Sequence, residues 1–548
     1  LPGRDRRYDR RMTTAPVLVF GIDGADFDIV EELLAAGRMP TIAGLRAAGA
    51  YGPLRSTEPP ITPVAWSTFL TGLRPAEHGI FNFSTNPFRG GFRIESAAHR
   101  AGAPVWRYLN AAGLRSAMVL IPFTHPVEDV GGLVVSGYGG PERPTIHPPE
   151  AAARIAERFP NLVTAHHPMK ERYWEDYDRY RGLLVENVVE VERLCEHVLA
   201  SERPDLFCVD FMSSDTIGHL AWHLRDPQHP AHDPALAADH IGEVYDAVDA
   251  AVGRLIARAE QIYGRSVNAI VVSDHGMKPI HHVFHVNRWL EQRGHLRFRR
   301  RSAQRMRGLA RLDSHMALRY RWYPGLYDRL VPFGAAPATA NRTMRDLDRW
   351  HTDAYAYGTG GPIYLGEATG RRGDTAFRDR LIDELRREPS PVDGQPAFTV
   401  LAGDDVHHGR FSDKAPDILI TANDPRIMVD SSRRAWPSAW VRHEHLDPSQ
   451  NYGYSGHHGP IGIIAAAGPS VAHERIEGAG IVDLAPTMLA LLGVEAETEL
   501  DGRPLAAFSP ALDPVGTTAS AGAVADQTVY SSDEERAISE RLEALGYE

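Results

Sequence analysis

The chain of 548 residues has only two cysteines, Cys195 and Cys208. Two cysteines provide neither a disulfide framework nor a thiolate metal cluster. Cys208 lies in an apolar run typical of a buried strand, so we expect it in the core. Since a chain of this length buries a large core without cross-links or structural metal, any bound metal ion is expected to serve chemistry rather than folding.

The sequence also lacks long apolar runs. No stretch is long and apolar enough to predict a membrane span. Residues 1–13 are rich in arginine but lack the apolar segment of a secretory signal. We interpret them as an N-terminal extension, in which Met12 is a candidate for the natural start. Together these features predict a cytoplasmic protein.

Positive charge is not in excess, because the formal net charge is -12. This balance argues against nucleic-acid binding, which needs clustered positive charge. It does not exclude a small phosphate ester as substrate, since bound metal ions can supply local positive charge. The sequence does not predict an oligomeric state.

Short apolar runs alternate with longer helical patterns along the chain. This alternation predicts an α/β fold with a mostly parallel sheet flanked by helices. In such sheets, ligands bind outside the carboxyl ends of the strands. The expected strands are 17–22, 116–121, 205–211, 268–273 and 461–466, and the expected helices are 29–36, 183–200, 241–260 and 485–492.

Two regions interrupt the alternation, and we expect both to be cap segments inserted in a catalytic domain at 14–508. Residues 150–181 are polar and helical in pattern. Residues 297–350 begin with an arginine run and continue with many aromatic residues. Neither composition predicts which substrate the caps would select.

The C-terminal segment 509–548 is expected to be a linker followed by a helix. Residues 510–526 are rich in Ala, Thr, Gly and Pro, a composition typical of linkers. Ser531 and Glu534 have the spacing of a capping box, which predicts that a helix begins there.

Acidic residues and histidines follow several of the expected strands. Asp23 ends the first strand, where a buried acid is costly unless a cation or a donor meets it. Asp215 and His219 follow another strand, at a spacing that lets both face one point of a helical turn. Asp274 and His275 follow a third. Each residue taken alone also fits a turn or a helix cap, but their recurrence favours metal ligands.

A fourth site precedes a strand, where His457 and His458 come just before the apolar run at 461–466. Carboxylate and imidazole ligands suit Zn²⁺, and also Mn²⁺ or Fe²⁺. Two such ions about 4 Å apart can clamp the attacking and leaving oxygens of a phosphoryl transfer. The combined pattern therefore predicts a two-metal site.

Thr62 is the candidate nucleophile. It precedes Pro63, where we expect a helix to begin, and a helix N-terminus offers free N–H groups to an anion. A threonine hydroxyl needs a base or a metal ion to become a nucleophile. Taken alone, Thr62 is better explained as a helix cap.

These motifs, in this order, resemble the alkaline phosphatase superfamily, and in particular its type I phosphodiesterase/nucleotide pyrophosphatase family. The resemblance extends from about Val17 to Leu505. The family signature T-G-x-x-P-x-x-H-G-I is matched by residues 71–80, and counting back from it places the nucleophile on Thr62. The other matches are a first metal-binding Asp at Asp23, D-x-x-x-H at Asp215 and His219, S-D-H-G at 273–276, and S-G-x-H at 455–458, which favours His458 over His457.

The resemblance implies two metal sites, occupied by zinc on the family analogy, with manganese as the alternative. The implied ligands are Asp23, Asp274, His275 and Thr62 for one ion, and Asp215, His219 and His458 for the other. One position departs from the family, which commonly has an Asn three residues after the nucleophile to hold a phosphate oxygen. This chain has Ala65 there.

The sequence thus predicts metal-dependent hydrolysis of phosphate esters, most of all phosphodiesters or nucleotide pyrophosphates. Attack by Thr62 would give a covalent phospho-threonine that water then hydrolyses. The same site fits a phosphomonoesterase, a phosphonate hydrolase or a phosphotransferase. A metal-dependent binding protein without turnover is a further alternative.

Overall fold

The computed structural model describes residues 14–166, 171, 173–299, 347–431, 438–444, 454–510, 514–520, 524 and 529–544. The predicted N-terminal extension lies outside these residues. So do most of the arginine-rich cap segment and about half of the predicted linker.

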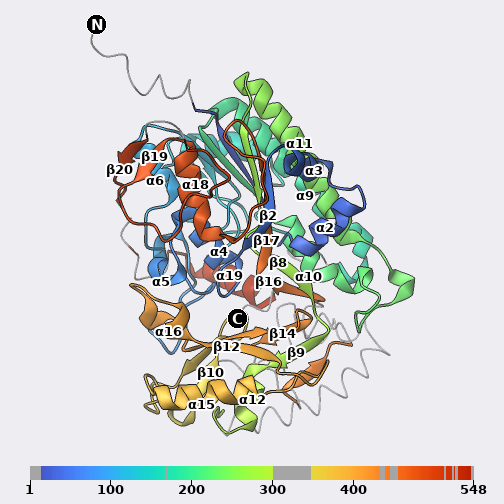
Figure 1. Ribbon diagram of the computed structural model, residues 1–548, viewed down its shortest axis with the longest axis vertical. Coiled ribbons are helices and arrows are strands. Elements are labelled where there is room, and N and C mark those ends of the chain that lie inside the picture. Colours follow the sequence, from blue (N-terminus) through green and yellow to red (C-terminus); the bar gives the residue numbers. More distant parts are fainter. Residues whose placement is uncertain are drawn as a thin grey trace.

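A nine-stranded sheet forms the centre of the molecule, in the order β18-β2-β17-β7-β1-β6-β3-β4-β5 (Figure 1). In it, β1 lies between β6 and β7 and is parallel to both. β17 is antiparallel to its neighbours β2 and β7. The predicted mostly parallel sheet and its five expected strands are confirmed. The strands are β1 (Val17–Ile22), β2 (Ala50–Arg55), β3 (Ser116–Val119), β4 (Leu133–Val135), β5 (Ile146–His147), β6 (Leu206–Phe211), β7 (Asn268–Val272), β17 (Ile461–Ala467) and β18 (Ala479–Gly480).

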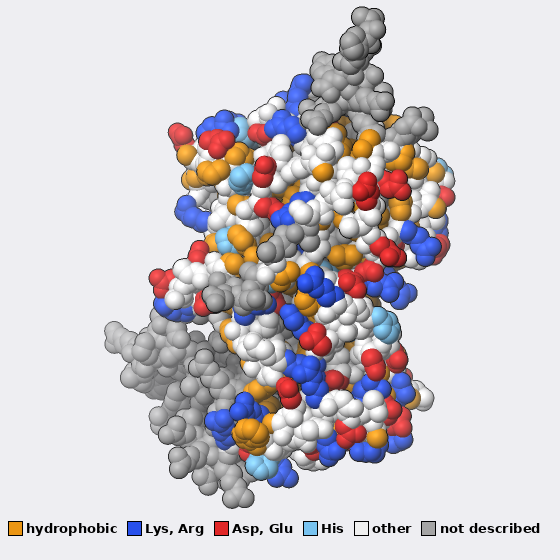
Figure 2. Space-filling view, turned by 90° about the vertical axis from the view of Figure 1, so that its left-hand side faces the viewer, with side chains coloured by type: hydrophobic (Ala, Val, Ile, Leu, Met, Phe, Trp, Pro, Cys, Tyr) orange, Lys and Arg blue, Asp and Glu red, His pale blue; other side chains and the backbone are white. Residues whose placement is uncertain are grey.

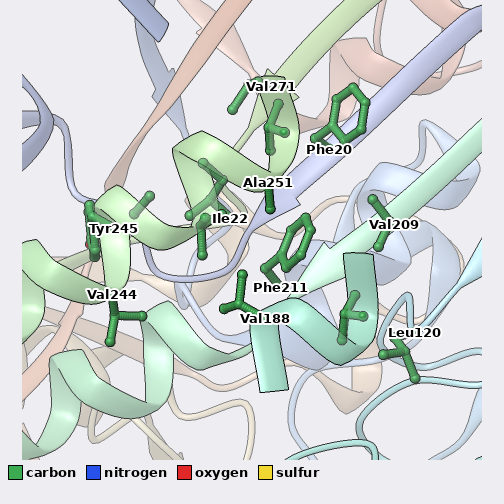
Figure 3. Packing of buried hydrophobic residues seen from close by; sticks show 14 of the residues in the cluster. Phe20, Ile22, Leu120, Val188, Val209, Phe211, Val244, Tyr245, Ala251 and Val271 are labelled. Carbon is green, nitrogen blue, oxygen red and sulfur yellow. The ribbon is translucent and has the colours of Figure 1, made fainter. Parts of the chain in front are cut away.

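Helices cover both faces of this sheet, so its central strands are apolar on both sides. In β1, Phe20 and Ile22 pack into the core beneath one layer of helices, whereas Val19 packs beneath the other. Figure 3 shows the first of these cores, where Phe20 and Phe211 of the sheet meet helical side chains. The first layer contains α2 (Phe27–Ala35), α3 (Pro40–Ala48), α9 (Tyr177–Glu202), α10 (Ser213–Arg225) and α11 (His240–Tyr263), and the second α4 (Thr62–Thr71), α6 (Val105–Ala111) and α18 (Leu484–Leu491).

A second lobe lies below the central sheet in Figure 1 and has its own hydrophobic core around Phe284, Trp289 and Phe398. Two small sheets build it, with the orders β14-β9-β15 and β10-β11-β13-β12. The lobe takes in described residues between 282 and 442, a longer stretch than the cap expected at 297–350. Its elements are β9 (His282–His285), α12 (Val286–Gln292), β10 (Ala354–Ala356), β11 (Ile363–Leu365), α15 (Thr375–Arg386), β12 (Phe398–Ala402), α16 (Gly403–Val406), β13 (Ile418–Ala422), β14 (Ile427–Asp430) and β15 (Trp440–Arg442).

Shorter elements complete the described chain. These are α5 (Pro75–His78), α7 (Pro149–Arg158), β8 (Gly276–Pro279), β16 (Gly456–Gly459), β19 (Val494–Ala496), β20 (Val515–Thr517) and α19 (Ser532–Ala544). In addition, 3-10 turns occur at Ala97–His99, Tyr173–Glu175, Pro234–Leu236, Arg349–His351, Ser412–Lys414 and Ile481–Asp483.

The C-terminal segment is only partly a linker. It contains β20, which pairs in parallel with β19 of the preceding part of the chain. The capping box before α19 is confirmed, because the Ser531 backbone N–H donates to the Glu534 carboxylate and the Ser531 hydroxyl accepts from the Glu534 backbone N–H. The domain boundaries themselves stay a prediction.

The described helices include none with the length and apolar character that a membrane crossing requires. On the face shown in Figure 2, acidic and basic side chains are interspersed rather than gathered into patches of one sign.

Gly21 in β1 makes room for two side chains near the sheet's carboxyl edge. A Cβ atom at this position would lie 2.6 Å from both Asp210 Oδ1 and the Trp66 ring. Because these neighbours are buried, we expect Gly21→Ala to lower the free energy of unfolding by about 1–3 kcal/mol. Urea unfolding followed by circular dichroism measures the change.

The matched control is Gly44→Ala in α3, where a Cβ atom would meet nothing within 4 Å. Alanine should raise the free energy of unfolding there by about 0.5–1 kcal/mol, because it favours the helix. Equal effects of the two substitutions would contradict the packing described for Gly21.

Candidate active site

Three parallel strands deliver the acidic residues to one edge of the sheet. Asp23 follows β1, and Asp274 with His275 follows its neighbour β7. On the other side of β1, strand β6 leads into α10, whose first turn carries Asp215. Since parallel neighbours end at the same edge, these carboxylates gather there, and all three are at least nine-tenths buried.

His458 reaches the same edge by a different route. Because β17 is antiparallel to β7, the chain before β17 lies beside the carboxyl end of β7. There β16 pairs with β8, so that His458 stands opposite Met277. His458 Nε2 is 2.9 Å from His219 Nε2 and 3.4 Å from Asp215 Oδ1. His457 instead directs its Nε2 to the carbonyl of Pro425, 2.9 Å away, so the geometry agrees with the preference for His458.

Thr62 is the first residue of α4 and is 2% exposed. Its Oγ1 lies 3.4 Å from His275 Nε2. The same nitrogen is 3.3 Å from Asp274 Oδ2 and 3.6 Å from Asp23 Oδ1. The structure therefore brings together all seven residues that the sequence predicts for the site.

Three buried carboxylate oxygens in this cluster accept no hydrogen bond from any described residue. They are Asp23 Oδ1, Asp215 Oδ1 and Asp274 Oδ2. A buried carboxylate without a partner is costly, and a cation removes this cost. Asp23, Asp274 and His275 form one group whose ligand atoms all lie within 4.8 Å of one another, and Asp215, His275 and His458 form a second. The donors and their geometry fit two adjacent divalent cations.

Each imidazole of the cluster is oriented by its other ring nitrogen. The Nδ1 atoms of His219, His275 and His458 lie 2.9, 3.1 and 3.0 Å from the carbonyl oxygens of Gly456, Gly276 and Pro60. Donation from Nδ1 to a carbonyl leaves Nε2 as the lone-pair nitrogen that can bind a metal ion. All three Nε2 atoms face the carboxylates.

Burial sets the ionisation of the metal-free cluster. It lowers the pKa of both His275 and His458 to about 4, so these rings are neutral, as metal ligands must be. It raises the pKa of Asp274 to about 7. Burial also raises the pKa of Asp23 well above its usual value, and the neighbouring Asp274 adds to this rise. Crowded carboxylates of this kind are stabilised by a cation.

Asp215 differs from the other acids. Burial would raise its pKa, but the adjacent imidazoles of His219 and His458 outweigh this effect and hold the pKa well below its usual value. Asp215 thus stays ionised between the two imidazoles.

Two side chains at the site were not predicted. Asp210 in β6 is 1% exposed, and neither of its carboxylate oxygens accepts a hydrogen bond from a described residue. The signal in the sequence was an acid inside the otherwise apolar run at 206–211. Trp66 donates its indole N–H to Asp23 Oδ2 over 3.0 Å. No local sequence pattern indicates that this tryptophan belongs to the site, because it is equally typical of a core residue of α4.

Ala65, which stands where the family commonly has an asparagine, is fully buried. It belongs to the hydrophobic core between α4 and the sheet.

The family model described as type I phosphodiesterase/nucleotide pyrophosphatase matches residues 17–461. This match spans most of the chain and includes every predicted site residue. The chain therefore belongs to the type I phosphodiesterase/nucleotide pyrophosphatase family. Among curated proteins, no sequence matches it.

Solved structures with a similar fold include human ectonucleotide pyrophosphatase/phosphodiesterase 5. It shares 16% identity with a TM-score of 0.49, and the alignment covers 89% of this chain and 97% of that chain. The murine protein, in an inactive variant in complex with AMP, gives the same values. Phosphonoacetate hydrolase from Sinorhizobium meliloti 1021, in complex with phosphonoformate, shares 14% identity with a TM-score of 0.49, covering 86% of this chain and 94% of that chain.

Proposed function

We propose that the protein is a two-metal phosphodiesterase with Thr62 as its nucleophile. The observation that carries the proposal is the convergence of three unpartnered carboxylate oxygens and three imidazole Nε2 atoms on one buried edge of the sheet, beside the Thr62 hydroxyl. Family membership supports hydrolysis of phosphate ester or pyrophosphate bonds. It does not by itself select among these substrates.

We assign the residues to two ligand sets, as the family resemblance implies. One consists of Asp23, Asp274 and His275 with Thr62, and the other of Asp215, His219 and His458. Bound divalent cations, of which zinc and manganese are the first to test, would supply positive charge to the reacting oxygens and favour ionisation of the threonine hydroxyl.

The position of Thr62 suits attack on a phosphate. It stands at the N-terminus of α4, where the helix dipole favours an anion. In the proposed reaction Thr62 Oγ1 bonds to phosphorus, and the bond from phosphorus to the leaving alcohol breaks. The covalent phospho-threonine keeps the second ester group of the substrate, and water then hydrolyses it, which releases a phosphomonoester and frees Thr62.

The experiment that tests the proposed function is a comparison of metal-loaded enzyme on bis-p-nitrophenyl phosphate and p-nitrophenyl phosphate. We expect the diester to have the higher kcat/KM. A higher value for the monoester would instead favour a phosphomonoesterase. Lack of turnover on both, and on nucleotide pyrophosphates and phosphonates, would favour a binding protein.

Trp66 should tune the metal site through its hydrogen bond to Asp23. We expect Trp66→Phe to weaken metal affinity by about 10–100-fold, because partners of a ligating carboxylate fix its orientation. Competition with a fluorescent zinc chelator measures the affinity. The control is Trp289→Phe, which removes an indole hydrogen bond to Glu388 in the second lobe, 2.8 Å long. Equal affinities of the two variants would contradict a role for Trp66 at the metal site.

A further inference from the structure

A cavity of about 340 Å³ lies between the central sheet and the second lobe. Its wall is mainly apolar and comes from both sides of the interface. The core contributes Phe27, Pro60 and Ile61, and the lobe contributes Ile420, Ile427 and Met428. This volume is at the lower end of the range of about 300–1,000 Å³ that is usual for small-molecule sites.

The cavity shares a wall with the candidate active site. His458 lines it, and the Nε2 atom of this residue lies 3.4 Å from Asp215 Oδ1. Ile61, which also lines it, immediately precedes Thr62. Between them, the Pro60 carbonyl meets His458 Nδ1 at 3.0 Å. A group held in this cavity would therefore stand next to the cluster that carries the nucleophile.

The charged residues of the wall do not suit a nucleotide. Among the described residues, Lys278 is the one cationic side chain of the wall, and its ammonium group is already paired with Asp26 and Asp28, at 3.0 and 2.6 Å. It thus offers no spare positive charge for a further phosphate. Apart from histidine, Phe27 is the one aromatic ring that the described part of the chain gives the wall, and it is stacked on Tyr51 with 5.8 Å between centroids. Apolar contact is what the cavity chiefly provides.

We propose that this cavity binds the apolar alcohol group of the substrate, so that the preferred substrates are phosphodiesters carrying an alkyl chain. The inference rests on the proposed function, because it assigns the substrate class of that same site. Burial of a methylene group in an apolar site strengthens binding about fourfold. Affinity is therefore expected to rise steeply with chain length until the cavity is full.

The test uses p-nitrophenyl methyl, butyl and octyl phosphodiesters with metal-loaded enzyme. We expect KM to fall at least tenfold from the methyl to the octyl ester, with a much smaller change in kcat. Met428→Glu places a charge in the half-buried lobe wall and should abolish most of this dependence. The control is Leu401→Glu on the same lobe, where the side chain is 40% exposed and outside the cavity, and it should keep the dependence.

Calorimetric binding of methylphosphonate and octylphosphonate to the Thr62→Ala variant separates the cavity from the chemistry. Tighter binding of octylphosphonate than of methylphosphonate supports the inference if Met428→Glu removes the difference. This holds even if no ester is turned over, and in that case only the proposed function fails. Equal binding of the two phosphonates overturns the inference. Turnover of all three esters with the same KM overturns it as well, and leaves the phosphodiesterase proposal standing.

Discussion

Replacement of Thr62 by alanine is expected to lower kcat for a phosphodiester by at least about a thousandfold, the order of loss seen when an enzyme loses its nucleophile. The Thr62 hydroxyl is the group that would bond to phosphorus. Its Oγ1 lies 3.4 Å from His275 Nε2, within the cluster of proposed metal ligands. The loss should appear in kcat rather than in KM, because the bond to phosphorus forms only in the reaction. Steady-state kinetics on bis-p-nitrophenyl phosphate measure it.

Thr62→Ser is the matched control, since serine keeps the hydroxyl at the same helix terminus. It should retain most of the activity that alanine loses. The metal content of both variants must be measured, because Thr62 is also a proposed ligand. Equal kcat values for wild type and Thr62→Ala, at equal metal content, would show that another group attacks phosphorus.

Chelation of the metal ions is expected to abolish turnover and to lower the melting temperature. Without cations, the buried carboxylates of Asp23, Asp210 and Asp274 crowd one edge of the sheet, and burial raises the pKa of each. Ions that bind only the folded state add about 4 kcal/mol of stability when free metal is a thousandfold above its dissociation constant. Calorimetry with and without a chelator measures the shift, and zinc or manganese should restore both properties.

Asp274→Asn separates metal binding from general packing at the site. Asparagine keeps the size of the side chain but removes the charge, so the variant should bind fewer ions and gain less thermal stability from added metal. The same gain in wild type and variant would contradict the assignment of Asp274 as a ligand. Activity that survives exhaustive chelation would contradict a metal-dependent reaction altogether.

The sequence was most informative where local pattern and sheet geometry agree. An acidic residue at the end of an apolar run is expected at the carboxyl edge of the sheet, because parallel strands end at a common edge. This reasoning is enough to predict that Asp23, Asp215 and Asp274 lie at that edge. The place of His458 could not be predicted in this way, since it depends on an antiparallel strand and on the pairing of β16 with β8. Only the family motif could single it out from His457.

Features that depend on distant contacts could not be read from the sequence. Trp66 meets Asp23 across 43 positions of sequence, and nothing local distinguishes it from a core tryptophan. Likewise the burial of Ala65 in the core follows from how α4 packs on the sheet. The apolar cavity is made by two parts of the chain more than three hundred residues apart, such as Phe27 and Ile420, and its existence depends on how the lobe meets the sheet.

The most direct test of the central claim is an acid quench of metal-loaded enzyme during turnover of a phosphodiester, followed by peptide mass spectrometry. A covalent phospho-threonine predicts that the peptide containing Thr62 carries the mass of the substrate's phosphoryl group together with the ester group that it keeps, and that this adduct is missing from Thr62→Ala. Turnover with that peptide unmodified, or with the adduct on another residue, would contradict the assignment of Thr62 as the nucleophile.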